Sequence, residues 1–185
     1  MTFEQFFNSE IKSRLIKFFT YNHTKFYDVS EIARSLDLPS GTVKSHLLKL
    51  LAEGFLKSKS SKSFSVSYKF PYLQDVKNLV LKFPPVADET LLKEIAKVGQ
   101  IKLFIIAGIF LNEEKARADI LIVGNRISEK KLERFLHLVE SQIGKEIRYV
   151  LLNAEEFKYR KNMFDRFILD VLEFPHKKLI NKLKV

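Results

Sequence analysis

The chain of 185 residues contains no cysteine. This absence excludes disulfide bridges and zinc sites with thiolate ligands, and it suits a protein of the reducing cytoplasm. The chain has only four histidines, which are too scattered to suggest a metal site: His23, His46, His137 and His176. We therefore expect neither a metal ion nor another cofactor.

Glycine is also scarce, and the six glycines do not cluster. The sequence lacks a phosphate-binding glycine loop, the nucleophile elbow of hydrolases and the paired histidines of zinc proteases. The most apolar stretch, residues 101–111, is too short for a membrane-spanning helix, which needs about 20 residues. The N-terminus has no basic start followed by an apolar run, so no signal peptide is expected. These absences favour a cytoplasmic protein without a membrane partner.

Positive charge is what the chain has in excess. Lysine and arginine outnumber aspartate and glutamate by 32 to 22, and the pI is about 9.6. Residues 1–70 carry 11 basic and 6 acidic groups, net +5, while the longer remainder carries 21 and 16, also net +5. Between Pro39 and Phe70 there are six lysines and one acid, Glu53. This surplus favours a polyanionic partner and is densest in the N-terminal part.

Residues 28–70 show an ordered series of structural signals. A short helix is expected after a cap at Ser30, and a second helix over residues 40–53 ends at Gly54. A hairpin follows over residues 56–69, with a lysine–serine tip. Its second strand alternates apolar and polar residues, with Phe64, Val66 and Tyr68 on one face. This order predicts a winged helix-turn-helix, which presents its second helix to a DNA major groove and its hairpin to the flanking backbone.

The second helix and the hairpin supply the candidate DNA contacts. Helical spacing turns Val43, Leu47, Leu50 and Leu51 inward. We expect Ser40 or Thr42 to cap the helix and both to contact a phosphate oxygen. Lys44, Ser45 and Lys49 are expected on the outer side, toward the base edges. The hairpin lysines are expected at the backbone or the minor groove: Lys57, Lys59 and Lys62. Two alternatives stay open, namely that these lysines are ordinary surface charges or that the module binds a protein.

The same segment resembles the bacterial ArsR-like winged-helix regulators. The resemblance rests on the turn Ser40-Gly41-Thr42-Val43, the polar pair Lys44-Ser45, the pair His46-Leu47 and the terminal Gly54. It covers about a third of the chain and implies a transcription regulator that binds double-stranded DNA, in which His46 serves packing or hydrogen bonding. The metal-sensing branch of that family does not fit, because the chain lacks cysteines and histidines at ligand spacing.

Helix and strand signals alternate after a break at Pro84-Pro85, where we place a domain boundary between residues 84 and 85. Three strands are expected, at residues 103–110, 118–123 and 147–152, in an α+β fold with a mixed sheet. The first is a continuous apolar run of the kind that is buried on both faces. Helices are expected at residues 89–98, 128–143, from 154, and at 164–172. The basic C-terminal segment 176–185 is expected to be solvated.

This C-terminal part resembles the small nucleotidyltransferase-like domain found fused to such winged helices. In that family a strand ends in Gly-Ser, the next strand carries Asp-x-Asp, and a later strand adds a third carboxylate, so that two metal ions are held. Here Gly108 is followed by Ile109, Asp119 is followed two residues later by Leu121, and Arg148 stands on the later strand. The resemblance therefore implies a catalytically inactive domain in which Gly108 and Asp119 are a vestigial nucleotide site. Asp119 is alternatively a polar residue at a strand edge or a cap.

Together these features predict a homodimeric DNA-binding regulator, because two-fold pairing doubles the contact that one winged helix makes. Phe3, Phe6 and Phe7 are candidates for the dimer interface or for packing within the chain. The C-terminal domain would be a scaffold, a dimerisation element or a site for a nucleotide-like effector. Two alternatives remain: a minimal nucleotidyltransferase that uses the winged helix to dock its substrate, and a protein-binding adaptor.

Overall fold

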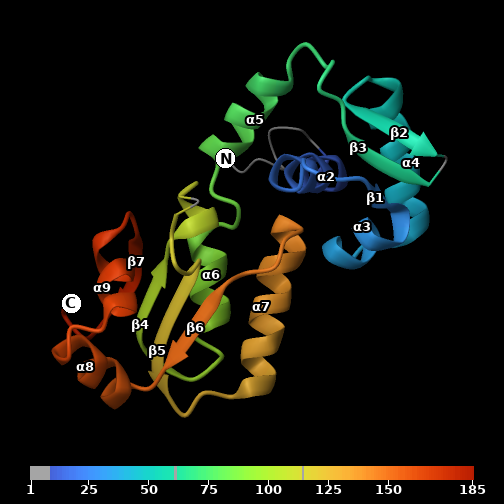
Figure 1. The fold of residues 1–185 in the computed structure, drawn as a ribbon. Helices are drawn as coiled ribbons and strands as arrows, with labels where there is room; N and C mark the ends of the chain where they lie inside the picture. The colour runs from blue at the N-terminus through green and yellow to red at the C-terminus, as the bar shows by residue number, and fades with distance from the viewer. Residues whose placement is uncertain (1–8, 61, 114) are drawn as a thin grey trace. The chain divides into compact units, whose positions relative to one another are not determined.

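A computed structural model describes residues 9–60, 62–113 and 115–185 of the chain (Figure 1). The expected α+β class is confirmed, since helices accompany two separate sheets. The chain divides into two compact units. Unit 1 runs to Pro85 and also takes in Glu140–Lys145, and unit 2 comprises Val86–Val139 and Glu146–Val185. The expected interface residues Phe3, Phe6 and Phe7 lie outside the described residues.

Unit 1 contains four helices and one small sheet among its described elements. The helices are α2 (Glu10–Tyr21), α3 (Val29–Leu36), α4 (Ser40–Ala52) and α5 (Leu73–Lys82). The strands are β1 (Tyr27–Asp28), β2 (Leu56–Ser60) and β3 (Ser63–Val66), in the order β1-β3-β2 with antiparallel pairing. Helices α3 and α4 are thus separated by a short turn, and α4 leads directly into the β2–β3 hairpin.

Helix caps were only partly predictable. Ser9 caps α2, and its hydroxyl accepts the Lys12 N–H. Asp28, and not the expected Ser30, caps α3, because the side chains of Asp28 and Glu31 each accept the other's backbone N–H. This capping box starts the helix before Ser30.

Helix α4 begins one residue earlier than a cap at Ser40 would allow. Pro39 occupies the cap position, and no side chain caps the helix. The expectation that Ser40 or Thr42 is the cap is therefore wrong, because both residues lie inside the first turn. The Pro39 carbonyl accepts the Val43 N–H at 3.0 Å, which closes that turn.

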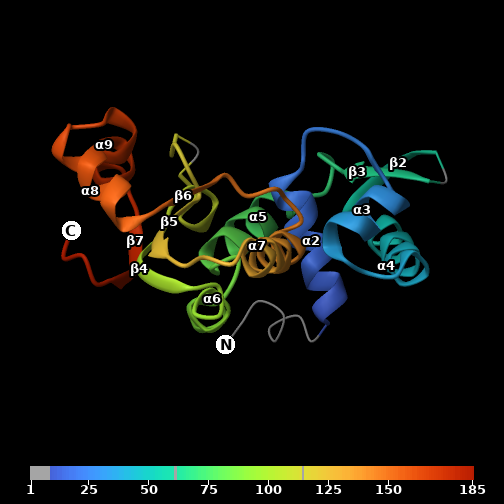
Figure 2. The ribbon, with the colours of Figure 1, turned by 90° about the horizontal axis from the view of Figure 1, so that it is seen from below.

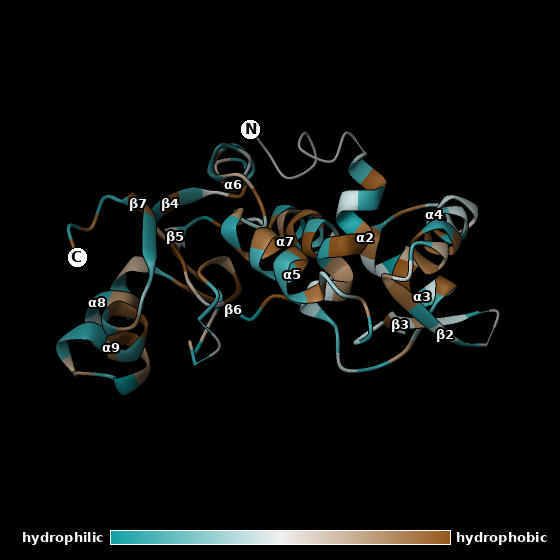
Figure 3. Cartoon of the chain, turned by 90° about the horizontal axis from the view of Figure 1, so that it is seen from above, coloured by the Kyte–Doolittle hydropathy of each residue, from teal (hydrophilic) through white to brown (hydrophobic). Residues whose placement is uncertain are grey.

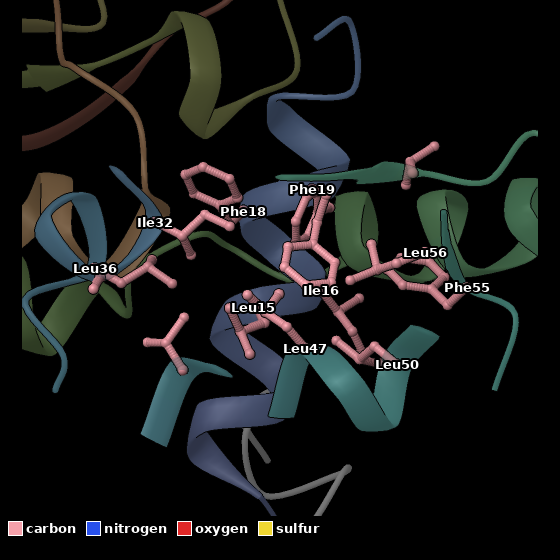
Figure 4. Packing of buried hydrophobic residues seen from close by; sticks show 14 of the residues in the cluster. Leu15, Ile16, Phe18, Phe19, Ile32, Leu36, Leu47, Leu50, Phe55 and Leu56 are labelled. Carbon is pink, nitrogen blue, oxygen red and sulfur yellow. The ribbon is translucent and has the colours of Figure 1, made fainter. Parts of the chain in front are cut away.

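The core of unit 1 gathers apolar side chains from all its helices and from the hairpin (Figure 4). Hydrophobic and hydrophilic residues alternate around the helices, as burial on one side requires (Figure 3). Leu15 and Phe19 of α2 and Leu47 of α4 are fully buried. Tyr68 departs from expectation, because β3 already ends at Val66 and the Tyr68 side chain is 61% exposed.

The segment Glu140–Lys145 belongs to the packing of unit 1. The Asn22 side-chain amide donates to the carbonyls of Phe18 and Gly144, each at 2.9 Å. The Arg14 guanidinium donates to the Ser141 carbonyl at 2.8 Å and also to the Leu36 carbonyl. Gly144 ends the preceding helix with a φ of 74°, and a Cβ there would lie 2.5 Å from a ring carbon of Phe18. Only glycine fits this contact.

Unit 2 is built on a four-stranded mixed sheet in the order β6-β5-β4-β7. The strands are β4 (Gln100–Ile106), β5 (Ile120–Asn125), β6 (Tyr149–Leu152) and β7 (Lys177–Asn181). Strands β5 and β6 are parallel, while β4 pairs antiparallel with β5 and with β7. The expected mixed sheet is confirmed. The lysines of the C-terminal segment are exposed, as expected of a solvated segment, but the sequence did not indicate that residues 177–181 form the edge strand β7.

Helices cover both faces of this sheet (Figure 2). They are α6 (Asp88–Ile95), α7 (Glu129–Ile143), α8 (Ala154–Asn162) and α9 (Arg166–Glu173). Leu103 and Leu121 pack with Phe157 of α8 and Ile168 of α9 on one face. On the other face, Phe104 meets Phe135 of α7 edge to face with ring centroids 5.9 Å apart. In the part of the chain that the structure describes, no helix combines the length and apolarity needed to cross a bilayer.

The apolar run of β4 ends earlier than expected. The strand stops at Ile106, and Gly108–Phe110 forms a turn of 3-10 helix in place of the expected continuation to Phe110. Gly108 adopts a φ of 51°, a left-handed conformation that interrupts the strand. This turn lies beside Asp119, which immediately precedes β5.

Candidate nucleic-acid interface

Helix α4 separates a buried face from an exposed one. Val43, Leu47 and Leu50 are almost inaccessible to solvent, because they recur at helical spacing and face the core. The opposite side exposes the polar residues expected there, together with Leu48: Ser40, Gly41, Lys44, Ser45 and Lys49. Thr42 is half-buried. The expected contact residues of α4 therefore come together on one side of the helix, except that Thr42 is partly covered.

Hydrogen bonds within α4 already use some of these side chains. The Ser45 hydroxyl donates to the Thr42 carbonyl at 2.8 Å. The His46 ring nitrogen Nδ1 lies 3.0 Å from the same carbonyl, in line with the hydrogen-bonding role expected for His46. Ser45 must therefore break this bond before its hydroxyl can donate to an external acceptor such as a phosphate oxygen. By contrast, the side chains of Lys44 and Lys49 make no hydrogen bond or ion pair with the described residues.

The start of α4 is open to an anion. Because no side chain caps this helix, its first backbone N–H groups have no acceptor of the usual kind. An open hollow lies at this end and is lined by residues of both helices and of the turn, among them Arg34, Asp37, Pro39 and Ser40. Helix N-termini favour negative charge, so this end of α4 suits a phosphate oxygen. Sequence reasoning missed Arg34, since it belongs to the preceding helix.

The β2–β3 hairpin carries the remaining expected lysines, and Lys57, Lys59 and Lys62 are all exposed. The register of the hairpin shifts between Ser58 and Ser60, so the strand is irregular close to its tip. The Lys57 ammonium group lies over the rings of Phe26 and Tyr68.

The one acid between Pro39 and Phe70, Glu53, is paired away from the lysines of α4. Glu53 accepts from the Lys12 ammonium group of α2 at 2.8 Å. Both side chains are partly exposed, so the pair contributes little to stability. Its effect is local neutralisation of a carboxylate that would otherwise repel an anionic ligand.

A second candidate site surrounds Asp119 in unit 2. Its side chain is 3% exposed and accepts the backbone N–H groups of Ile109 and Arg148, each at 3.0 Å. The Arg148 guanidinium adds two further bonds, from Nε at 3.0 Å and from NH2 at 2.9 Å. A third guanidinium nitrogen donates to the Ala116 carbonyl at 2.9 Å. Asp119 is thus held by four donors, with Arg148 in a bidentate pairing.

Asp119 and Arg148 each stabilise the charged form of the other. Burial alone would raise the pKa of Asp119, but the hydrogen bonds from Arg148 and Ile109 and the charge of Arg148 together hold that pKa below its usual value. Hydrogen bonding to Asp119 in turn raises the pKa of Arg148. Both groups are therefore charged at neutral pH.

The backbone of Gly108 and apolar side chains of the sheet lie close to Asp119. A Cβ at Gly108 would lie 2.0 Å from an Asp119 carboxylate oxygen, so the backbone approaches this side chain closely. Leu121 is buried in the apolar cluster of the sheet and offers no ligand atom. No group of three or more histidine, aspartate or glutamate side chains suited to a metal exists among residues 9–60, 62–113 and 115–185.

Comparisons with protein-family models, with curated proteins and with solved structures found no match for this chain.

Proposed function

We propose that the chain is a DNA-binding transcription regulator. Helix 40–53 would contact bases in the major groove of double-stranded DNA, and hairpin 56–69 the backbone or the minor groove. The observation that carries this proposal is the exposed side of α4, where Lys44 and Lys49 have no partner among the described residues. The open start of the helix adds backbone donors for a phosphate, and the hairpin continues the positive charge.

The order α3, turn, α4, β2, β3 supports a winged helix-turn-helix of the ArsR-like kind. The tight turn at Pro39 and the inward stripe of α4 are what that module requires. We further propose a homodimer, because a pair of such helices contacts two half-sites and gains both affinity and sequence discrimination. The partner would be duplex DNA, and we propose no role for a membrane.

For unit 2 we propose a nucleotidyltransferase-like domain without catalysis, serving as scaffold, dimerisation element or effector site. This proposal is supported by the Arg148 guanidinium, which is hydrogen-bonded to the Asp119 carboxylate that would otherwise be available to a metal ion. One carboxylate that is already neutralised cannot assemble a two-metal site. Incorporation of labelled nucleotide in the presence of magnesium or manganese, abolished by Asp119→Asn, would contradict this part of the proposal.

Selection from a pool of random duplexes tests the proposal as a whole. The full chain is mixed with the pool at low salt, bound fragments are recovered and sequenced, and the cycle is repeated. We expect a recurring motif, with two half-sites spaced by whole turns of the duplex if the chain acts as a dimer. Failure to retain any fragment at low salt would contradict DNA binding, since the electrostatic part of binding needs no particular sequence.

A further inference from the structure

Two lysine ammonium groups of unit 1 lie over the same exposed aromatic ring. Lys57 of β2 approaches the centroid of the Tyr68 ring to 5.6 Å, and Lys77 of α5 approaches it to 5.7 Å. Lys57 also lies 5.4 Å from the ring centroid of Phe26, which is 37% exposed. Segments that are separate in sequence thus place two positive charges beside one exposed ring.

The ring that joins these lysines is itself held in place. The Tyr68 hydroxyl donates to the His23 carbonyl at 3.0 Å, which fixes the orientation of a side chain that is otherwise 61% exposed. Ammonium groups are attracted to the face of such a ring, and this attraction restricts the usual freedom of a lysine side chain. Lys57 and Lys77 are therefore better ordered than a lysine that extends into solvent.

The charge of this cluster has no counterpart within the described chain. Neither Lys57 nor Lys77 forms an ion pair with a carboxylate among the described residues. Both charges are therefore available to an external anion, and ordered lysines lose less conformational entropy when they bind it. The chemistry of the cluster fits the negatively charged oxygens of a phosphodiester backbone.

We propose that Lys57 and Lys77 form a phosphate-contact site that Tyr68 positions, so that the nucleic-acid interface extends from α4 and the hairpin to α5. This inference rests on the proposed DNA binding. It assigns a contact to Lys77, which lies beyond the winged module, and it makes Tyr68 a positioning residue rather than a ligand of the DNA.

The test compares two lysines of the same helix by their effect on salt dependence. Lys77→Ala and Lys82→Ala remove one charge each from α5, but only Lys77 contacts the Tyr68 ring. Affinity for a duplex recovered by the selection is measured across a range of salt concentrations. We expect Lys77→Ala to reduce the slope of log K against log salt by about 0.9, as one lost phosphate contact requires, and Lys82→Ala to leave it unchanged.

Ring variants test the positioning role. Tyr68→Leu keeps the net charge and removes the ring, and we expect it to weaken binding about threefold to tenfold, whereas Tyr68→Phe keeps the ring and stays closer to the wild type. Circular dichroism shows whether each variant is folded. If Tyr68→Leu does not fold, Lys77→Ala still tests the inference, because it truncates only a surface side chain. If the wild type binds the duplex but Lys77→Ala and Lys82→Ala give the same slope, this inference fails alone. If the wild type binds no duplex, the proposed function fails, and the inference with it.

Discussion

In unit 1 the side chains of Lys44, Lys49 and Lys59 are exposed to solvent, whereas Asp119 of unit 2 is enclosed and bound by four donors. Lys44, Lys49 and Lys59 have no side-chain hydrogen bond or ion pair with the described residues, and the only acid between Pro39 and Phe70 is paired with Lys12. A charge without an internal partner is available to an external one, while a paired and buried charge stabilises the fold. This difference is the reason to look for the interaction surface on unit 1.

The largest effect on the free energy of unfolding is expected at Gly144, because residues 140–145 pack into unit 1. Gly144→Ala introduces a Cβ at a φ of 74° and 2.5 Å from a Phe18 ring carbon. We expect a loss of about 2–4 kcal/mol in the free energy of unfolding, from the left-handed conformation and from overpacking.

Gly54→Ala is the matched control for this substitution. Gly54 has a φ of 79° but no atom within 4 Å of the added Cβ, so only the conformational cost of about 1 kcal/mol applies. Urea unfolding measures both variants. Equal losses for the two substitutions would contradict the packing of residues 140–145 into unit 1.

The second largest effect concerns the enclosed carboxylate of unit 2. Asp119→Ala leaves the N–H groups of Ile109 and Arg148 without their acceptor, and we expect it to cost about 2–3 kcal/mol of unfolding free energy. Arg148 is 54% exposed, so water can solvate its freed guanidinium and limits the loss. Asp170→Ala breaks the exposed pair with Arg117 and should cost less than about 1 kcal/mol. If both substitutions cost the same, Asp119 is not the structural charge that we describe.

The pKa of Asp119 also predicts how the free energy of unfolding depends on pH. Because folding holds this pKa below its usual value, the unfolded chain takes up a proton more readily than the folded chain does. The stabilisation is therefore complete at neutral pH and is lost as the pH falls from about 4, the ordinary carboxyl value, through the lower folded-state pKa. In urea titrations over this range, Asp119→Asn should show a flatter dependence than the wild type. Parallel curves would assign the pH dependence to other carboxyl groups.

Substitutions of single lysines in unit 1 should have the smallest effects. We expect Lys44→Ala and Lys59→Ala to change DNA binding in two different ways. Lys44→Ala is expected to reduce affinity for a selected site about tenfold while changing binding to unrelated duplexes less, because its place on α4 is near the bases. Lys59→Ala should weaken binding to all duplexes by a similar few-fold factor and lower the salt slope by about one contact. Fluorescence anisotropy with one selected and one scrambled duplex separates the two. If both substitutions act equally on both duplexes, α4 contributes charge but no sequence discrimination.

Local patterns predicted most of the elements that carry these charges. The period of Val43, Leu47 and Leu50 located α4 and the direction of its polar side, and the lysine–serine tip located the hairpin. These features depend on neighbours in sequence, so they can be predicted from it.

The features that the sequence did not reveal depend on distant partners. Strand β7 is rich in lysine and became a strand through pairing with β4, which lies more than 70 residues earlier. Asp119 and Arg148 are 29 residues apart, and no short pattern indicates that they meet. The alternating pattern places Tyr68 on a half-buried strand, but its role at the surface follows from Lys57, Lys77 and His23, which three separate segments of the chain bring to it.

The most direct test of DNA binding through unit 1 makes the same change of charge on each unit. Lys44→Glu with Lys49→Glu reverses two exposed charges on α4, and Lys130→Glu with Lys131→Glu reverses two exposed charges on α7 in unit 2. Both double variants have the same net charge, and their affinities for one selected duplex are measured at a fixed salt concentration. We predict a loss of about 100-fold or more for the α4 variant, and binding within about threefold of the wild type for the α7 variant. Equal losses would show that only net charge matters and would contradict the assignment of the interface to α4.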